Sequence, residues 1–309
     1  MSKKYSNIIL RLGTGLVGIP LIVGLLYWNE WSYFFLFLII LIGTLLEFYG
    51  LINNQQPLPR SIRIWGVLFA VLLYTLSFMY AKGSMPGTYY GLTLPMLTVI
   101  YLMMLYKKNT MNPFSSIAHI FLGIIYVGMP FALLHFIAFD NTIYHYEFVL
   151  GILIIVWMND IGAYVVGSLL GKHQLFKRIS PKKTWEGTIG GALLALLVSY
   201  LIACYDTSWS IVQWMIIGMI TVIAGPYGDL VESLFKRSLQ IKDSGTIIPG
   251  HGGFLDRFDS LLLTVPLIVA FNTLGKNINP PKQFNQKVNI THQLNKKIQP
   301  ENKYGPSIE

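Results

Sequence analysis

Four carboxylates in the last third of the chain flank a basic stretch and have the spacing of metal ligands. Asp229 and Glu232 are three residues apart, which places them on one face of a helix. Asp256 and Asp259 are also three residues apart, at the start of the next apolar stretch. Two such pairs suit a hard divalent cation, because Mg²⁺ takes oxygen ligands and shares them with bound phosphates. The sequence therefore predicts a magnesium site formed by these four residues, and a second cation is left open.

The residues between the two carboxylate pairs are suited to holding phosphate groups. Gly252 and Gly253 follow His251 and offer backbone N–H groups to an anion. Four basic side chains are available to neutralise further phosphate oxygens, namely Lys236, Arg237, Lys242 and Arg257. The alternative is that these basic residues reach the membrane interface and that the carboxylates pair with them. That alternative explains a single residue such as Lys236, but an anchored loop does not need four carboxylates.

Two further groups of polar residues precede this region. Asn159 and Asp160 lie in the middle of an apolar stretch, where an ionisable side chain is costly and usually functional. The alternative for Asp160 is a structural hydrogen bond between helices. Ser180, Lys182 and Lys183 precede the next apolar stretch, with Ser180 suited to cap that helix. A helix start with two lysines favours an anion site, and ordinary positive flanking of a membrane helix is the alternative.

The composition indicates which elements position these residues. The chain of 309 residues is 53% hydrophobic and only 12% charged, about half the charged share of a soluble domain. Its apolar residues come in blocks of about twenty, the length at which a helix crosses the hydrocarbon of a bilayer. A soluble enzyme, a disordered chain and a fibrous chain are therefore all excluded. The single cysteine, Cys204, excludes a disulfide framework and a cysteine-based metal site.

We predict an all-α, polytopic membrane protein, a bundle of about nine transmembrane helices. Helices are expected because the backbone N–H and C=O groups of a segment in lipid must form hydrogen bonds within that segment. The first helix is expected to be retained rather than cleaved as a signal sequence. The predicted spans are 8–27, 31–51, 62–80, 88–106, 114–138, 147–171, 185–204, 210–229 and 254–275.

The basic residues predict the orientation of the bundle. With the N-terminus in the cytoplasm, the inside connections carry sixteen Lys and Arg residues, and the outside connections before the last span carry only Lys82. The net charge of +9 thus reflects membrane topology, and no nucleic-acid partner is expected. Six further lysines follow in the tail, which this orientation places outside. That conflict with the rule is resolved if distant tail charges count little or if one span is re-entrant.

The chain is expected to have three parts. Residues 1–146 form about five N-terminal helices, and residues 147–275 form the catalytic membrane region. The longest cytoplasmic connections of the catalytic region are 172–184 and 230–253. Residues 276–309 are rich in Asn, Lys, Gln and Pro, and we expect this polar tail to be disordered.

Several motifs resemble those of one enzyme family. Upstream they are Asn159-Asp160 with Ala163-Tyr164, Ser180-Pro181-Lys182-Lys183-Thr184-Trp185-Glu186-Gly187 and Gly228-Asp229-x-x-Glu232-Ser233. Downstream they are Ser233-x-Phe235-Lys236-Arg237, then Lys242-Asp243-x-Gly245, then Ile248-Pro249-x-His251-Gly252-Gly253-Phe254-x-Asp256-Arg257-Phe258-Asp259. The downstream pattern resembles the signature of the phosphatidate cytidylyltransferases, the CDP-diacylglycerol synthases. The resemblance is specific over about 157–259.

The resemblance implies a reaction and a set of roles. CTP and phosphatidic acid would give CDP-diacylglycerol and pyrophosphate, the first committed step of phospholipid head-group synthesis, with Mg²⁺ required. By analogy, Asp229 and Asp256 are the principal metal ligands, with Asp259 and Glu232 beside them. The phosphates would be held by Lys236, Arg237, Lys242 and Arg257, and Ser180, Lys182 and Lys183 would close the cavity from the other side. His251 would donate to the leaving pyrophosphate.

Two alternatives remain open at this point. One is a related CTP-dependent lipid kinase of the polyprenol or phytol type, although the complete HGGxxDRxD string disfavours it. The other is a cation-coupled transporter, which would also use carboxylates in the membrane but would be expected to show repeated halves. For the enzyme we expect a bacterial-type plasma membrane, an active site facing the cytoplasm, contact with membrane lipid, and a homodimer.

Overall fold

A computed structural model of the chain describes residues 2–108, 112–206, 208–241, 244–245 and 252–278, with side chains from residue 15 to 275. The chain divides into two compact units, 1–269 and 270–309. Everything said below of packing and of the site concerns the first unit. Lys242 and His251, and the tail from residue 279, lie outside the described residues.

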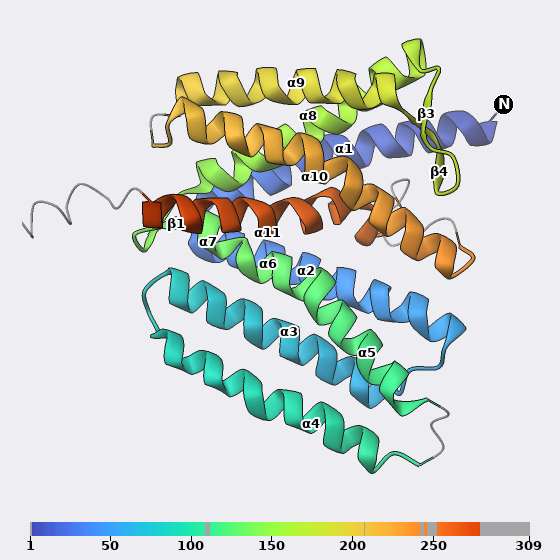
Figure 1. Cartoon of the computed structure of the whole chain (residues 1–309), viewed down its shortest axis with the longest axis vertical. Helices are drawn as coiled ribbons and strands as arrows, with labels where there is room; N and C mark the ends of the chain where they lie inside the picture. The colour runs from blue at the N-terminus through green and yellow to red at the C-terminus, as the bar shows by residue number, and fades with distance from the viewer. Residues whose placement is uncertain (1, 109–111, 207, 242–243, 246–251, 279–309) are drawn as a thin grey trace, which may run out of the picture. The chain divides into compact units, whose positions relative to one another are not determined.

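Helices dominate the structure, as the sequence predicts (Figure 1). The N-terminal helices are α1 (Ser2–Trp28), α2 (Glu30–Gln55), α3 (Arg60–Ala81), the 3-10 helix η1 (Gly87–Leu92) and α4 (Thr93–Leu105). The next apolar segment contains α5 (Pro113–Gly123), the π-helical turn η2 (Ile124–Gly128), α6 (Met129–Leu133) and α7 (His135–Ala138). The later helices are α8 (Tyr146–Leu170), α9 (Trp185–Tyr205), α10 (Ile211–Ser238) and α11 (Leu255–Ile278).

Two short antiparallel hairpins interrupt the helices. One pairs β1 (Phe139–Asp140) with β2 (Ile143–Tyr144), and the other pairs β3 (Gln174–Phe176) with β4 (Ser180–Thr184). The second hairpin corrects the expectation that Ser180 caps a helix. Ser180 begins β4, whereas the Thr184 side chain accepts the Gly187 N–H and caps α9. The helix therefore starts where the strand ends.

Eight of the described segments are long and apolar enough to cross a membrane, and they agree with the second to ninth predicted spans to within a few residues, except that α10 continues to Ser238. The part of α1 with described side chains, Gly15–Trp28, is apolar but shorter, so the count of nine stays a prediction. Capping boxes start two of the helices, Asn29 with Ser32 at α2 and Ser210 with Gln213 at α10.

The helices pack in a way that gathers the polar termini. Figure 1 shows α8, α9 and α10 side by side, and contacts between all three pairs agree with this view. Gly162 of α8 allows a close approach to α9, because a Cβ there would lie 2.9 Å from the Cα of Gly191. The start of α1, the C-terminal ends of α2, α8 and α10, the hairpin β3–β4 and the start of α11 all lie on the same side in Figure 1.

Candidate active site

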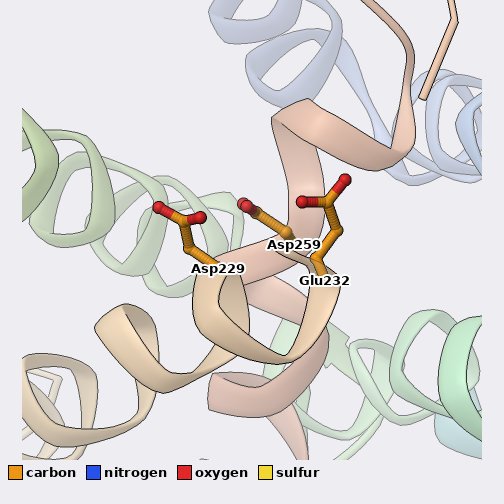
Figure 2. A group of neighbouring side chains, drawn as sticks. All are labelled: Asp229, Glu232 and Asp259. Carbon is orange, nitrogen blue, oxygen red and sulfur yellow. The ribbon is translucent and has the colours of Figure 1, made fainter. Parts of the chain in front are cut away.

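Three carboxylates meet where α10 passes the first turns of α11. Asp229 and Glu232 come from α10 and Asp259 from α11, and one oxygen from each lies within 4.8 Å of the others. Figure 2 shows the three side chains gathered between the two helices. The Glu232 side chain is only 1% exposed, so water does little to stabilise its charge. Such a group needs a cation nearby.

The donor set fits a magnesium ion. One Glu232 oxygen, Oε2, pairs with Lys236, but Oε1 is buried and has no hydrogen-bond partner among the described residues. A buried polar atom of this kind is rare unless something binds it. Three carboxylate oxygens close together match the oxygen ligands that Mg²⁺ takes, with room for phosphate oxygens to complete its coordination.

Asp256 lies beside this group of three rather than within it. The Lys236 Nζ is 2.6 Å from Glu232 Oε2 and 2.7 Å from Asp256 Oδ1, so one ammonium bridges two carboxylates. The other Asp256 oxygen, Oδ2, faces the backbone N–H groups of Ser244 and Gly253, at 3.4 and 3.3 Å. In this structure Asp256 therefore balances Lys236, and its role as a principal metal ligand stays a prediction.

A second lysine reaches the carboxylates from the β3–β4 hairpin. The Lys183 Nζ lies 2.6 Å from Asp229 Oδ2 and donates to the Pro226 carbonyl at 3.2 Å. The sequence placed Lys183 across the cavity from Asp229, and the structure brings the two together.

These residues line one cavity of about 630 Å³. Lys182 lines it too, although its side chain is largely exposed, and so do Asn159 and Asp160 of α8. The charged lining residues are Asp160, Lys182, Lys183, Asp229, Glu232, Lys236, Asp256, Arg257 and Asp259. The cavity thus combines five carboxylates with four cations, which suits a polyanion bound together with a divalent metal.

Close contact between α10 and α11 creates the carboxylate cluster. A Cβ at Gly228 would lie 2.6 Å from the Asp259 carbonyl oxygen and 2.9 Å from the Ser260 Cα. Only a glycine lets the two backbones approach this far. Because Asp229 is the next residue, that contact sets the distance between Asp229 and Asp259.

Some predicted site residues lie elsewhere. Arg237 is exposed and donates to the Ile241 carbonyl at 3.2 Å. Ser180 pairs with Phe176 in the hairpin and is absent from the cavity lining, as are Gly252 and Gly253. Lys242 and His251 lie outside the described residues.

The resemblance of the sequence implies a nucleotide substrate, and for it we expect Lys183→Ala to lower kcat/KM by about 10- to 100-fold, the loss typical of one charge-assisted contact. Lys183 is the cation that faces Asp229, so its removal leaves phosphate oxygens without a donor on this side. Steady-state kinetics measures the change. Lys177→Ala, in the exposed turn of the same hairpin, is the matched control. Equal losses in both variants would exclude a specific role for Lys183.

The sequence analysis missed one polar residue near the site. Glu47 of α2 is 7% exposed and contacts Ser244 and Phe254, two described residues of the connection between α10 and α11. A signal was present, since Glu47 is a carboxylate inside a predicted membrane span. Nothing in the sequence, however, shows which distant segment meets it.

Comparisons with known proteins identify the family of the chain. The profile of the cytidylyltransferase family matches residues 9–274 of the chain. Phosphatidate cytidylyltransferase of Staphylococcus haemolyticus is 40% identical over 176 residues, which cover 56% of this chain and 66% of the relative. The proteins of the same name from Staphylococcus saprophyticus and Staphylococcus aureus are each 39% identical, over 178 and 177 residues, with the same coverage.

The chain thus spans 66% of the length of these curated relatives. The family match itself is broader, because it extends from within α1 to within α11 and includes all residues that line the cavity. The chain belongs to the cytidylyltransferase family.

Proposed function

We propose that this chain transfers CMP from CTP to phosphatidic acid, producing CDP-diacylglycerol and pyrophosphate. The observation that carries the proposal is the cavity in which Asp229, Glu232 and Asp259 face Lys183 and Lys236. It opens among helices long enough to cross a membrane, as a lipid substrate requires. The relatives named phosphatidate cytidylyltransferase support the choice of phosphatidate as acceptor.

The reaction joins two polyanions, so charge is its main obstacle. A phosphate oxygen of phosphatidate attacks the α-phosphorus of CTP, and the bond from that phosphorus to the bridging oxygen of pyrophosphate breaks. A bound Mg²⁺ ion would supply positive charge to the phosphate oxygens and the leaving pyrophosphate. Asp229, Glu232 and Asp259 would hold that ion, since one oxygen from each lies within 4.8 Å of the others.

The cations of the cavity would orient the two phosphate groups. Lys183 reaches the carboxylates from β4, and Lys236 reaches them from α10 itself. Arg257 lines the same cavity from the first turn of α11. When the metal and nucleotide bind, each lysine can move from its carboxylate to a phosphate oxygen. Its positive charge then still faces a negatively charged partner. Positioning of this kind supplies a large part of the rate in phosphoryl transfer.

The site is proposed to face the cytoplasm of a bacterial-type plasma membrane, where CTP is available. Support comes from the basic connections, which lie at the same side as the cavity-forming ends of α8, α10 and α11 (Figure 1). Phosphatidate would then reach the cavity from the adjoining lipid leaflet. The expected homodimer stays a prediction, to be checked by the mass of the detergent-solubilised protein.

Asp256→Asn is expected to abolish turnover at any practical Mg²⁺ concentration while the protein still inserts into the membrane. The change removes the charge that faces Lys236, at 2.7 Å, beside the carboxylate cluster. Turnover measured across a magnesium titration tests this. Retained activity would remove Asp256 from the metal site.

The proposed reaction is tested by incubating the purified protein with radiolabelled CTP and phosphatidate in detergent micelles. We expect a cytidylate product that partitions into chloroform and depends on both phosphatidate and Mg²⁺. Polyprenol in place of phosphatidate tests the related lipid kinase. If no chloroform-soluble cytidylate forms, the proposal is wrong.

A further inference from the structure

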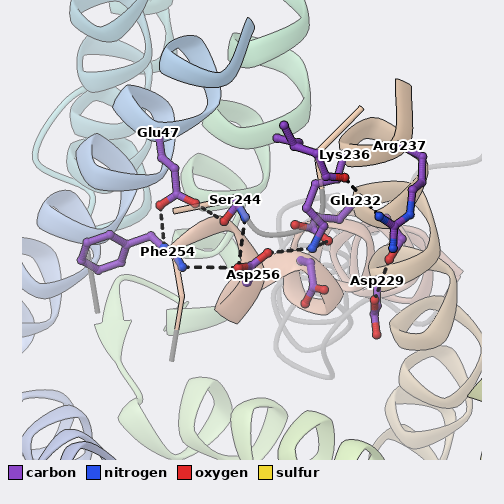
Figure 3. Close-up of polar contacts among 12 residues, drawn as sticks. Glu47, Asp229, Glu232, Lys236, Arg237, Ser244, Phe254 and Asp256 are labelled. Carbon is purple, nitrogen blue, oxygen red and sulfur yellow. Dashed lines mark hydrogen bonds and ion pairs between the residues drawn. The ribbon is translucent and has the colours of Figure 1, made fainter. Parts of the chain in front are cut away.

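Glu47 of α2 contacts two described residues of the connection that joins α10 to α11, Ser244 and Phe254. Its Oε2 accepts the Phe254 N–H at 2.7 Å, and its Oε1 accepts the Ser244 hydroxyl. These partners lie about two hundred residues further along the chain (Figure 3). One carboxylate in the N-terminal part thus holds a segment of the catalytic region at two points.

The backbone around Glu47 is shaped to admit it. A Cβ at Gly253 would collide with the Glu47 carboxylate, and one at Gly245 would lie 3.2 Å from its Cδ. One turn earlier in α2, a Cβ at Gly43 would lie 2.8 Å from the Phe254 ring. Glycines on both sides of the contact therefore let α2 and the connection meet closely.

No cation in the described part of the chain forms an ion pair with Glu47. A carboxylate in a membrane-spanning helix is costly, and two hydrogen bonds to the connection are what compensate for its burial there. A residue needed only for packing would be apolar. The hydrogen bonds to the Phe254 N–H and the Ser244 hydroxyl explain why a carboxylate stands at this position.

The segment held by Glu47 is the one that orients Asp256. Ser244 uses its hydroxyl on Glu47 and its backbone N–H on Asp256 Oδ2. Gly253, whose neighbour Phe254 binds Glu47, donates its N–H to the same oxygen. Asp256 then binds Lys236, which binds Glu232 of the carboxylate cluster.

We infer that Glu47 is a positioning residue of the active site. It fixes Ser244 and Phe254 so that the backbone N–H groups of Ser244 and Gly253 hold Asp256. Through Asp256 and Lys236 it sets the place of Glu232. This gives the N-terminal helix α2 a part in catalysis without contact with substrate. The expected effect of Glu47 on turnover rests on the proposed function. Its expected effect on amide hydrogen exchange at Ser244 and at 252–256 does not.

The test compares Glu47→Ala with Glu30→Ala, a carboxylate removed from the other end of the same helix, where Glu30 pairs with Lys82. We expect Glu47→Ala to lower kcat by about 10- to 100-fold, as for lost hydrogen bonds to a charged group, with KM for CTP nearly unchanged. Amide hydrogen exchange at Ser244 and at 252–256 should rise by a similar factor in this variant alone. Glu30→Ala should leave both quantities within about twofold, because an ion pair near the protein surface contributes little and this partly exposed one lies at the other end of α2.

Two further variants separate positioning from general loss of structure. Glu47→Gln should recover most of the activity, because its amide oxygen accepts the Phe254 N–H and its amide nitrogen donates to the Ser244 hydroxyl. Ser244→Ala should lower kcat alone but add little in the Glu47→Ala background, since both changes break the same contact.

Normal exchange at 252–256 in Glu47→Ala would overturn the inference, as would additive losses in the double variant or faster exchange throughout α2 and α3. If the wild-type protein makes no CDP-diacylglycerol, the proposed function fails. The exchange measurement then still decides whether Glu47 holds the connection.

Discussion

Asp259→Asn is expected to lower the rate of CMP transfer by about a thousandfold, because a metal-held charge contributes several kcal/mol to such a transition state. Asp259 is the one member of the carboxylate cluster that comes from α11, so it closes the site from the side opposite Asp229 and Glu232. An asparagine keeps the size of the side chain and removes the charge. The Mg²⁺ concentration for half-maximal activity should also rise.

The same substitution at a distant carboxylate is the control. Asp206→Asn changes a residue at the C-terminal end of α9, where Asp206 accepts a hydrogen bond from the Trp214 indole at 2.8 Å. It should retain most of the wild-type rate and the wild-type magnesium requirement. An Asp259→Asn enzyme with near-normal turnover would show that the three carboxylates do not hold the metal.

Gly228→Ala is expected to reduce turnover by about a hundredfold, the loss that a displacement of about 1 Å causes in a positioned site. The new methyl group would lie 2.6 Å from the Asp259 carbonyl oxygen, and a helix backbone cannot move aside cheaply. The α10–α11 contact would open and separate Asp229 from Asp259. Overpacking of this kind also costs about 1–3 kcal/mol of stability.

Gly50→Ala is the matched control for this change. Gly50 lies inside α2, and a Cβ there would meet nothing within 4 Å. Alanine favours a helix interior by up to about 1 kcal/mol over glycine, so this variant should be as stable as the wild type or more so. Thermal unfolding in detergent and turnover are measured for both. Normal turnover in Gly228→Ala would mean that the close contact does not set the site.

Much of the fold could be predicted because lipid imposes a simple rule on sequence. A helix that crosses the membrane must be apolar for about twenty residues, and spans such as 31–51 and 185–204 agree closely with α2 and α9. The same rule covers only part of α10, because the predicted span ended at residue 229 and the helix continues to Ser238. The Glu232–Lys236 pair and the stacking of Phe235 on Phe48 stabilise these extra turns, and neither depends on hydropathy.

The site could be predicted only as far as spacing along one helix carries information. Asp229 and Glu232 share a face because three residues make nearly one turn, and the structure agrees. Asp256 and Asp259 have the same spacing, yet Asp259 joins the cluster while Asp256 pairs with Lys236. That difference depends on the glycine contact at Gly228 and on the connection between the helices. Local sequence does not encode how those distant segments meet.

The position of the label transferred from CTP tests the central claim most directly. CTP labelled at the α-phosphorus and CTP labelled at the γ-phosphorus are each incubated with the purified protein, phosphatidate and Mg²⁺. A cytidylyltransferase moves the α-label into the chloroform phase and leaves the γ-label in pyrophosphate, which is the result we predict. Transfer of the γ-label to lipid would show a kinase, and no label in lipid from either CTP would contradict the proposed activity altogether.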